Sequence, residues 1–253
     1  MTLEEFIYPT QKQLFNRLCK IYDKRVAFCK GHFLIVKGSA PIMLVAHLDT
    51  VHEKPVKTIC TSSDGNILMS PEGIGGDDRC GVYALAKVYD TAEIKPWLLF
   101  TCNEEIGGIG ADMFCRCHAK GRLPAGLDDL KFLVEIDRKG NNDAVYYDCA
   151  NPDFEDFISE YGFKTAQGSF SDISYIAPEL GVAAVNLSSG YYNAHRLHEY
   201  INLAELEATI EKVSAILKTS VSKSTPRFDY VEAKINQLDD YYFSDKDYFK
   251  FMK

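Results

Sequence analysis

The sequence predicts an α/β fold, a three-layer α/β/α sandwich around a mixed, mainly parallel sheet. Largely apolar runs predict strands at residues 41–46, 97–100, 131–137 and 182–186. Segments with apolar residues at helical spacing alternate with these runs, as in 80–90 and 203–217. Strands that alternate with helices are typical of a mainly parallel sheet covered by helices on both faces.

Shorter patterns predict the other elements. Residues 3–22 predict a covering helix that restarts after Pro9, because proline begins a helix more readily than it continues one. The Asp64-Gly65 pair predicts a turn between two strands of a hairpin, 58–61 and 66–69. We also expect strands at 26–29 and 33–36, a turn at Glu104-Glu105 followed by a helix through Cys117, a strand at 144–149 next to strand 131–137, and a helix at 152–161.

Length and composition restrict the class of protein. At 253 residues the chain suits one large domain with a modest extension. We expect a main domain over 1–219 and a charged, aromatic extension over 220–253 that packs on the domain or on a partner. The net charge of −8, without a cluster of Lys and Arg, argues against nucleic-acid binding and favours small molecules or peptides as partners.

The cysteines and the N-terminal sequence favour a cytoplasmic, soluble protein. Eight cysteines are scattered through apolar and helical segments, without the framework of a small secreted domain, so we expect reduced thiols. The acidic start lacks the basic region of a signal peptide, and no apolar run approaches the ~18 residues that a membrane span requires. No membrane partner is expected.

Histidine and carboxylate side chains follow several of the predicted strands and turns. Because the carboxyl ends of strands in an open α/β sheet meet at one edge, these side chains are expected to share a crevice there. The set comprises His47, Asp77, Glu104, Glu105, Asp137 and His195. Imidazole and carboxylate ligands without thiolate suit zinc, with cobalt or manganese as substitutes. The set is larger than one tetrahedral zinc requires, so we expect two zinc ions that share a carboxylate.

The segments that carry these residues resemble the five ordered metal-site motifs of the co-catalytic two-zinc exopeptidases. That superfamily includes peptidase T, the zinc aminopeptidases and related carboxypeptidases. Each motif alone is weak, but five in the family's order, within residues 41–217, are specific. The segments are 47–51, 76–81, 103–107, 135–137 and 194–201. The resemblance implies the phosphorylase/hydrolase-like fold of zinc exopeptidases, with 1–219 as the catalytic domain.

The resemblance also implies a role for each residue. Asp77 bridges both ions, His47 and Asp137 complete one site, and Glu105 and His195 complete the other. Glu104 is the general base, which takes a proton from water and passes it to the leaving amine. Asp49 orients His47, as a carboxylate behind a metal-bound histidine usually does.

Alternatives remain at three of these positions. Asp78 competes with Asp77 as the bridge, and the order of the family motif favours Asp77. Glu135 shares strand parity with Asp137, which lies nearer the strand end. His198 competes with His195, and the family pattern of a histidine followed four residues later by a glutamate favours His195, with Glu199 beyond it.

The spacing between the last two ligands implies a bare catalytic domain. Only 58 positions separate Asp137 from His195, too few for the inserted lid or dimerisation domain of peptidase T and the related carboxypeptidases. The stretch 168–173 resembles the segment before the final strand of the single-domain zinc aminopeptidases. It makes Asp172, with Tyr191 or Tyr192, a candidate for contacts with the substrate amine and a developing oxyanion.

The expected function is therefore hydrolysis of small peptides by a zinc-dependent metallopeptidase, an aminopeptidase or di/tripeptidase. One alternative is a carboxypeptidase or N-acyl amino acid deacylase on the same site, for which Arg138, Lys139 or Arg196 could hold a substrate carboxylate. A second alternative is an inactive binding protein of the same fold. The sequence leaves open whether the chain forms a homo-oligomer.

Overall fold

Eight strands form the central sheet of the protein, which a computed structural model describes over residues 1–29 and 31–233. Their order across the sheet is β1-β2-β6-β3-β7-β10-β8-β9. The bounds in that order are β1 (Val26–Cys29), β2 (Phe33–Val36), β6 (Trp97–Thr101), β3 (Ile42–His47), β7 (Phe132–Arg138), β10 (Ala184–Ser188), β8 (Asp143–Val145) and β9 (Lys164–Ala166). Strands β6, β3, β7 and β10 run parallel, β8 and β9 run parallel to each other, and the remaining pairings are antiparallel.

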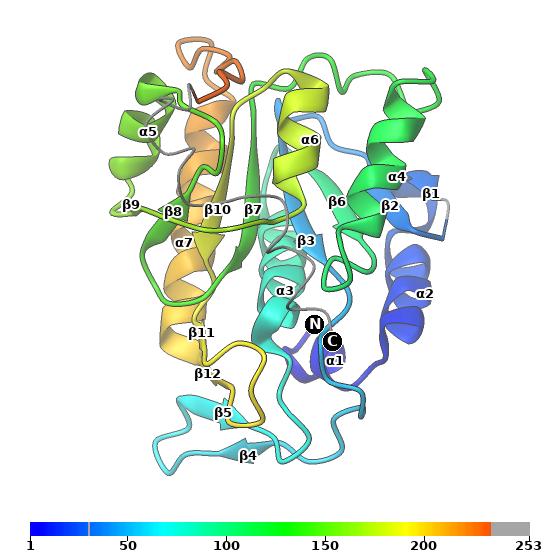
Figure 1. Cartoon of the computed structure of the whole chain (residues 1–253), viewed down its shortest axis with the longest axis vertical. Coiled ribbons are helices and arrows are strands. Elements are labelled where there is room, and N and C mark those ends of the chain that lie inside the picture. Colours follow the sequence, from blue (N-terminus) through cyan, green and yellow to red (C-terminus); the bar gives the residue numbers. More distant parts are fainter. Residues whose placement is uncertain (30, 234–253) are drawn as a thin grey trace, which may run out of the picture.

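Helices cover both faces of this sheet, which confirms the predicted three layers (Figure 1). One face packs against α1 (Glu4–Ile7), α2 (Gln11–Tyr22), α3 (Gly76–Thr91), α5 (Pro152–Ser159) and α7 (Leu203–Ser220). The other face packs against α4 (Ile109–His118) and α6 (Ile173–Leu180). Successive side chains of β3 point to opposite faces of the sheet. Leu44 therefore belongs to the apolar cluster on the first face, and Met43 and Val45 belong to the cluster on the other face.

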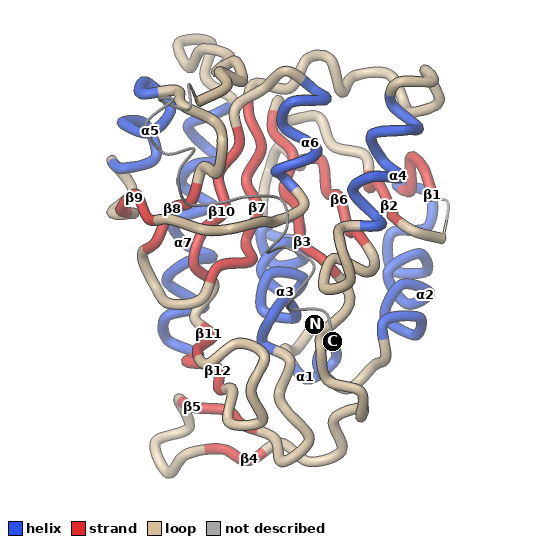
Figure 2. Tube along the Cα trace, viewed as in Figure 1, coloured by secondary structure: helices blue, strands red, loops and turns tan. Residues whose placement is uncertain are grey.

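A smaller antiparallel sheet lies at the end of the molecule where α3 begins (Figure 2). It contains β11 (Tyr191–Tyr192), β12 (Tyr200–Asn202), β5 (Ile67–Met69) and β4 (Cys60–Thr61) in that order. The predicted hairpin is confirmed as β4 and β5, and Gly65 in the turn has a φ of +78°, which glycine adopts without strain.

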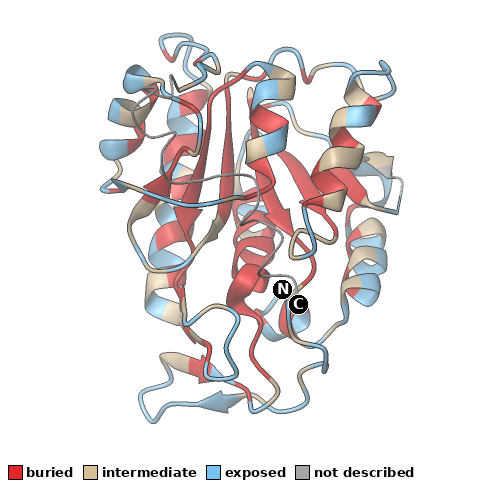
Figure 3. Cartoon of the chain, in the orientation of Figure 1, coloured by how far each residue is buried: buried red, intermediate tan, exposed pale blue. Residues whose placement is uncertain are grey.

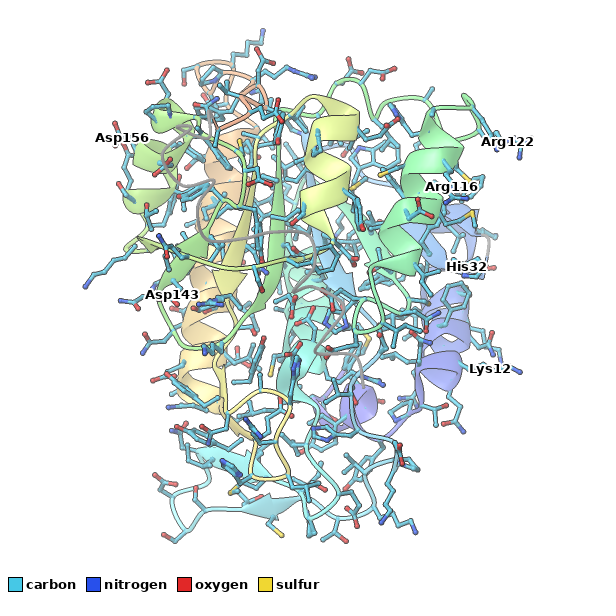
Figure 4. The ribbon with its side chains drawn as sticks, in the orientation of Figure 1. Lys12, His32, Arg116, Arg122, Asp143 and Asp156 are labelled. Atoms are coloured by element: carbon cyan, nitrogen blue, oxygen red, sulfur yellow. The ribbon has the colours of Figure 1, made fainter. Side chains whose placement is uncertain are left out.

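Local sequence explains why the helices begin where they do. The helix expected over 3–22 is interrupted at Pro9, as predicted, and α2 starts with a capping box in which Thr10 and Gln13 satisfy each other's backbone amides. A short 3₁₀ helix (Asp23–Arg25) then leads into β1. The central strands and α3 are buried, whereas β4 is exposed (Figure 3). Lys12 on α2, Arg116 on α4 and Asp156 on α5 lie at the periphery (Figure 4).

The segment between β7 and β10 differs from the prediction in two respects. The strand expected beside β7 is β8, but it pairs with β10, which lies between β7 and β8. Helix α6 and strand β9 were not predicted, because α6 contains Pro178 and β9 has only three residues. Every named element between β7 and β10 belongs to the large sheet or packs on it, so this part of the described chain contains no inserted lid domain.

The end of the described chain runs along the main domain. The amide of Ala183 donates to the carbonyl of Phe228, whose ring is buried against Phe132 and Phe154. Residues 234–253, most of the predicted extension, lie outside the described residues. No helix of the described residues is long and apolar enough to cross a membrane.

Candidate metal centre

Strand ends and turns bring the six predicted ligand and base residues together. His47 ends β3, Glu104 and Glu105 follow β6, and Asp137 lies near the end of β7. Asp77 lies in the first turn of α3, where the backbone departs from helical geometry and the Asp77–Asp78 peptide bond is cis. His195 lies between β11 and β12 with a φ of +63°. Three of the parallel strands, β3, β6 and β7, thus bring four of these residues to one edge, and Asp77 and His195 reach it from the start of α3 and the turn between β11 and β12.

The side chains form two groups that share Asp77. Its Oδ1 lies 3.2 Å from Nε2 of His47, and that nitrogen lies 3.4 Å from Oδ1 of Asp137. Its Oδ2 lies 3.2 Å from Nε2 of His195, which lies 3.1 Å from Oε2 of Glu105. Within each group the candidate ligand atoms lie within 4.8 Å of one another. The two oxygens of Asp77 therefore face two separate sets of ligands, which is the arrangement of a bridging carboxylate.

Asp49 supports this centre from behind. Its Oδ1 lies 3.3 Å from Nδ1 of His47, so the opposite ring nitrogen faces Asp77 and Asp137. Its two oxygens also accept hydrogen bonds of 3.1 Å from the backbone amides of Glu104 and Glu105. Burial alone would raise the pKa of Asp49, but its contacts with His47 and the two amides lower it. Asp49 therefore holds the imidazole and the turn after β6 in one geometry.

The electrostatics of the centre show an uncompensated cluster of acids. Burial and the charge of Asp77 raise the pKa of Asp137 well above its usual range. Burial alone would lower the pKa of His47, but the carboxylates around it, Asp137 first, raise it well above its usual value. Contacts with Asp77 and Glu105 raise the pKa of His195 to about 10. In the part of the chain that the structure describes, the carboxylates of the two ligand groups form ion pairs with the two histidines alone.

A metal ion fits the centre on chemical grounds. The donors are imidazole nitrogens and carboxylate oxygens, which suit zinc, and each group provides three of them. Oε1 of Glu105 is buried without a hydrogen-bond partner among the described residues. Because a buried unpaired carboxylate oxygen is costly, a cation between the ligands would satisfy it.

Glu104 lies at the edge of this centre. It forms a third group with His47 and Glu105, so its position alone also permits a ligand role. His47 and Glu105, however, already belong to the two groups that share Asp77, and Glu104 belongs to neither of those. Burial, and then the charges of Asp172 and Glu105, raise the pKa of Glu104 to about 8 even though His47 opposes the shift. A carboxyl group that titrates near neutral pH suits proton transfer.

A cavity of about 320 Å³ opens onto the centre. Its walls include Asp77, Glu104, Glu105, Asp137 and His195, together with eight further residues: Arg138, Lys139, Tyr147, Gly168, Ser169, Phe170, Tyr191 and Ala194. The hydroxyl of Tyr191 donates to the carbonyl of Asp137 over 3.1 Å. The cavity therefore places a tyrosine, a candidate base and the basic side chains of Arg138 and Lys139 around the candidate ligands.

The structure places the other predicted substrate contacts away from this cavity. Asp172 is fully buried, accepts a hydrogen bond from Thr101 and does not line the cavity wall. Burial raises its pKa to about 6. Tyr192 donates to Glu205 and stacks on Tyr200. Of the three candidates, Tyr191 alone lines the cavity.

The competing ligand candidates have other partners or positions. Asp78 is buried and accepts from the amides of His47 and Gly81, so it supports the backbone of the centre. Glu135 is buried and accepts from the hydroxyl of Ser171. His198 is exposed. None of the three belongs to a ligand group among the described residues.

Sequence reasoning missed a contact between His52 and Glu199. Nε2 of His52 lies 2.8 Å from Oε2 of the fully buried Glu199. The signal for Glu199 was its place in the last motif, four residues after His195. No local pattern predicted His52 as its partner, because 147 positions separate them.

Comparison with known proteins identifies the fold. The sequence matches no family model and no curated protein. The structure is similar to aminopeptidase PepT from Bacillus cereus ATCC 10987, with a TM-score of 0.65 and 15% identity over 87% of this chain and 97% of that chain. It is also similar to a tripeptidase from Staphylococcus aureus Mu50, with a TM-score of 0.64 and 15% identity over 87% and 97% of the two chains.

An archaeal enzyme gives the same result. Aminopeptidase APDkam598 from Desulfurococcus kamchatkensis has a TM-score of 0.62 and 15% identity, over 88% of this chain and 94% of that chain. At such low identity the likeness establishes the fold rather than the activity. The chain therefore has the fold of these aminopeptidases and this tripeptidase over most of its length.

Proposed function

We propose that the protein is a zinc-dependent exopeptidase that removes residues from small peptides, as an aminopeptidase or di/tripeptidase. The observation that carries the proposal is the position of Asp77, whose two oxygens face two separate ligand groups. Peptidases share this fold, and the cavity beside the ligands provides space for a short peptide.

The chain's own residues supply binding, orientation and proton transfer. His47, Asp77 and Asp137 would hold one ion, and Asp77, Glu105 and His195 the second, with cobalt or manganese as substitutes for zinc. Two bound cations would lower the pKa of a shared water and polarise the scissile carbonyl. Glu104 then accepts a proton from water and returns it to the leaving amine. Tyr191 lies on the cavity wall, where its hydroxyl could contact the developing oxyanion.

Paired variants of the two adjacent glutamates test this mechanism. We expect Glu104→Gln to retain two zinc ions and to lower kcat by about 10²- to 10⁴-fold, because it removes a general base. Glu105→Gln should instead lose one ion. Zinc content would be measured by elemental analysis, and activity on free dipeptides, tripeptides and aminoacyl anilides. Full activity of the Glu104→Gln variant would contradict the mechanism, and less than one zinc per wild-type chain would favour an inactive binding protein.

Lys139 supports a second candidate function. It is exposed and lines the cavity, whereas Arg138 contacts Asp143 and donates to the carbonyl of Gln167. A lysine at this position could hold a substrate carboxylate, as a carboxypeptidase or N-acyl amino acid deacylase requires. Cleavage of N-acyl amino acids but not of free peptides, together with loss of that activity in Lys139→Met, would establish this alternative.

We further propose a cytoplasmic location, on the cysteine pattern, and a homo-oligomer. One structure of similar fold, PhTET1-12s, is described as a dodecamer. Light scattering of the purified chain measures the oligomeric state directly. A monomer at all concentrations would exclude the oligomer.

A further inference from the structure

A buried carboxylate outside both ligand groups holds the turn that carries Asp77. Oε1 of Glu199 accepts a hydrogen bond of 2.9 Å from the backbone amide of Asp77, and Oε2 accepts one of 3.2 Å from the amide of Gly75. Glu199 is fully buried. The two oxygens therefore fix the backbone of the turn that carries Asp77, the residue that faces both ion sites.

His52 holds Glu199 from the other side. Its Nε2 lies 2.8 Å from the same Oε2 that binds Gly75. The imidazole packs directly on Gly73, where a Cβ atom would lie 2.3 Å from the ring. A Cβ at Gly76 would meet Tyr191 at 2.7 Å and Oε1 of Glu199 at 3.3 Å. The glycine-rich turn thus lets its backbone approach this pair closely.

Glu199 also connects the two loops that carry Asp77 and His195, two of the three ligands of the second ion site. It lies four residues after His195, and its amide closes a turn by donating to the carbonyl of Arg196. The side chain then reaches across to the Asp77 turn. Among the described residues, the hydrogen bonds and ion pairs of this carboxylate join it to Gly75, to Asp77 at the start of α3 and to His52. This pattern corresponds to that of Asp49, whose two oxygens fix the amides of Glu104 and Glu105.

We propose that Glu199, oriented by His52, is a positioning residue for the second ion site, formed by Asp77, Glu105 and His195. It sets the distance between Asp77 and His195, two of the three ligands of that site. The first site, with His47 and Asp137 on separate strands, depends on it less. The proposal rests on the two-ion centre of the proposed function.

Zinc binding to the intact chain tests the proposal without reference to activity. Wild-type protein, Glu199→Gln, Glu199→Leu and His52→Gln would be dialysed against a series of zinc buffers and analysed for bound zinc. We expect the second ion to bind about 10- to 100-fold more weakly in the Glu199 variants, as for other residues that orient metal ligands. The first ion should lose less affinity than the second, because Asp77 is the one ligand that the two sites share. His52→Gln should show a smaller loss than the Glu199 variants.

Two further variants separate positioning from a general loss of stability. In His195→Asn, which removes a ligand of the second ion, adding Glu199→Gln should cause no further loss of zinc, because both changes act on one site. Glu207→Gln, which removes a carboxylate on α7 that accepts from Tyr83, should retain both ions. Thermal unfolding identifies any variant that fails to fold. If Glu199→Leu does not fold, the single variants His52→Gln and Glu199→Gln still test the positioning role.

The outcomes are distinct. Wild-type affinity for both ions in folded Glu199→Gln and Glu199→Leu would overturn the positioning role. Equal weakening of both ions, with further loss in the double variant, would show a general structural role and also overturn it. Failure of the wild-type chain to bind a second zinc would instead contradict the proposed function.

Discussion

Asp49 lies directly behind His47, with its Oδ1 3.3 Å from Nδ1 of the imidazole. The same carboxylate accepts hydrogen bonds from the amides of Glu104 and Glu105. One buried side chain thus fixes the end of β3 relative to the turn after β6. Because ligand geometry governs metal affinity, this contact should affect metal binding although Asp49 belongs to neither of the two ligand groups that share Asp77.

Asp49→Asn tests that expectation with little change in size. An amide provides one oxygen where the carboxylate provides two, so its nitrogen must face either a backbone amide or the imidazole. We expect zinc to bind about 10- to 100-fold more weakly, with a matching fall in kcat at limiting zinc. Competition with a chelator measures the affinity. Asp112→Asn, which changes an exposed carboxylate paired with Arg116, is the control and should bind zinc normally.

Removal of metal should destabilise the protein. The centre packs three carboxylates and two histidines within a few ångströms, and a cation relieves the repulsion among the acids. At free zinc about 1,000-fold above the dissociation constant, one site contributes about 4 kcal/mol, which raises Tm by about 8 to 16 °C for a chain of this size. Calorimetry in chelator and in zinc measures the shift. In Asp77→Asn, zinc should raise Tm only slightly. A rise in Tm equal to that of the wild type would indicate that zinc binds elsewhere.

The sequence was most informative where local chemistry determines structure. Apolar runs predicted β3, β6 and β7 because each lies in the buried centre of the sheet. A histidine or a carboxylate ends each run or follows it closely, so the position of that side chain relative to the sheet edge followed from strand direction. Thr10 after Pro9 and Asp64-Gly65 likewise specify their cap and turn through neighbouring residues.

Contacts between distant segments were not predictable in the same way. The place of β8 beside β10 depends on the path of the whole chain between them. Asp172 lies in the stretch 168–173, which suggested substrate contact, yet it is fully buried, accepts a hydrogen bond from Thr101 and does not line the cavity. His52 has no pattern of its own, and its role depends on a carboxylate 147 positions away.

Glu104 predicts a pH dependence of stability in the metal-free protein. Burial and neighbouring acids raise its pKa from a usual value near 4.5 to about 8. Between those values the folded state retains a proton that the unfolded state has lost, so this carboxyl makes folding less favourable as pH rises from about 4.5 to about 8. Glu104→Gln cannot ionise and should be more stable than wild type at pH 8, with the difference disappearing near pH 4.5.

Urea unfolding in chelator at both pH values measures this difference. Comparing the two proteins at each pH removes the contributions of Asp137, His47 and His195, which also have shifted pKa values. Glu53→Gln, at an exposed position, should match wild type throughout. A difference that is the same at pH 4.5 and pH 8 would show that Glu104 titrates normally.

Tyr191 and Tyr192 provide a matched pair for the substrate site. They are adjacent in β11, but Tyr191 lines the cavity and Tyr192 bonds to Glu205 away from it. Tyr191→Phe removes the hydroxyl that lies beside Asp137, so we expect kcat to fall about 100-fold, as for loss of one oxyanion donor. KM should change little, and both zinc ions should remain. Tyr192→Phe should leave kcat unchanged. If Tyr191→Phe loses zinc in proportion to activity, the hydroxyl positions Asp137 rather than contacting the oxyanion.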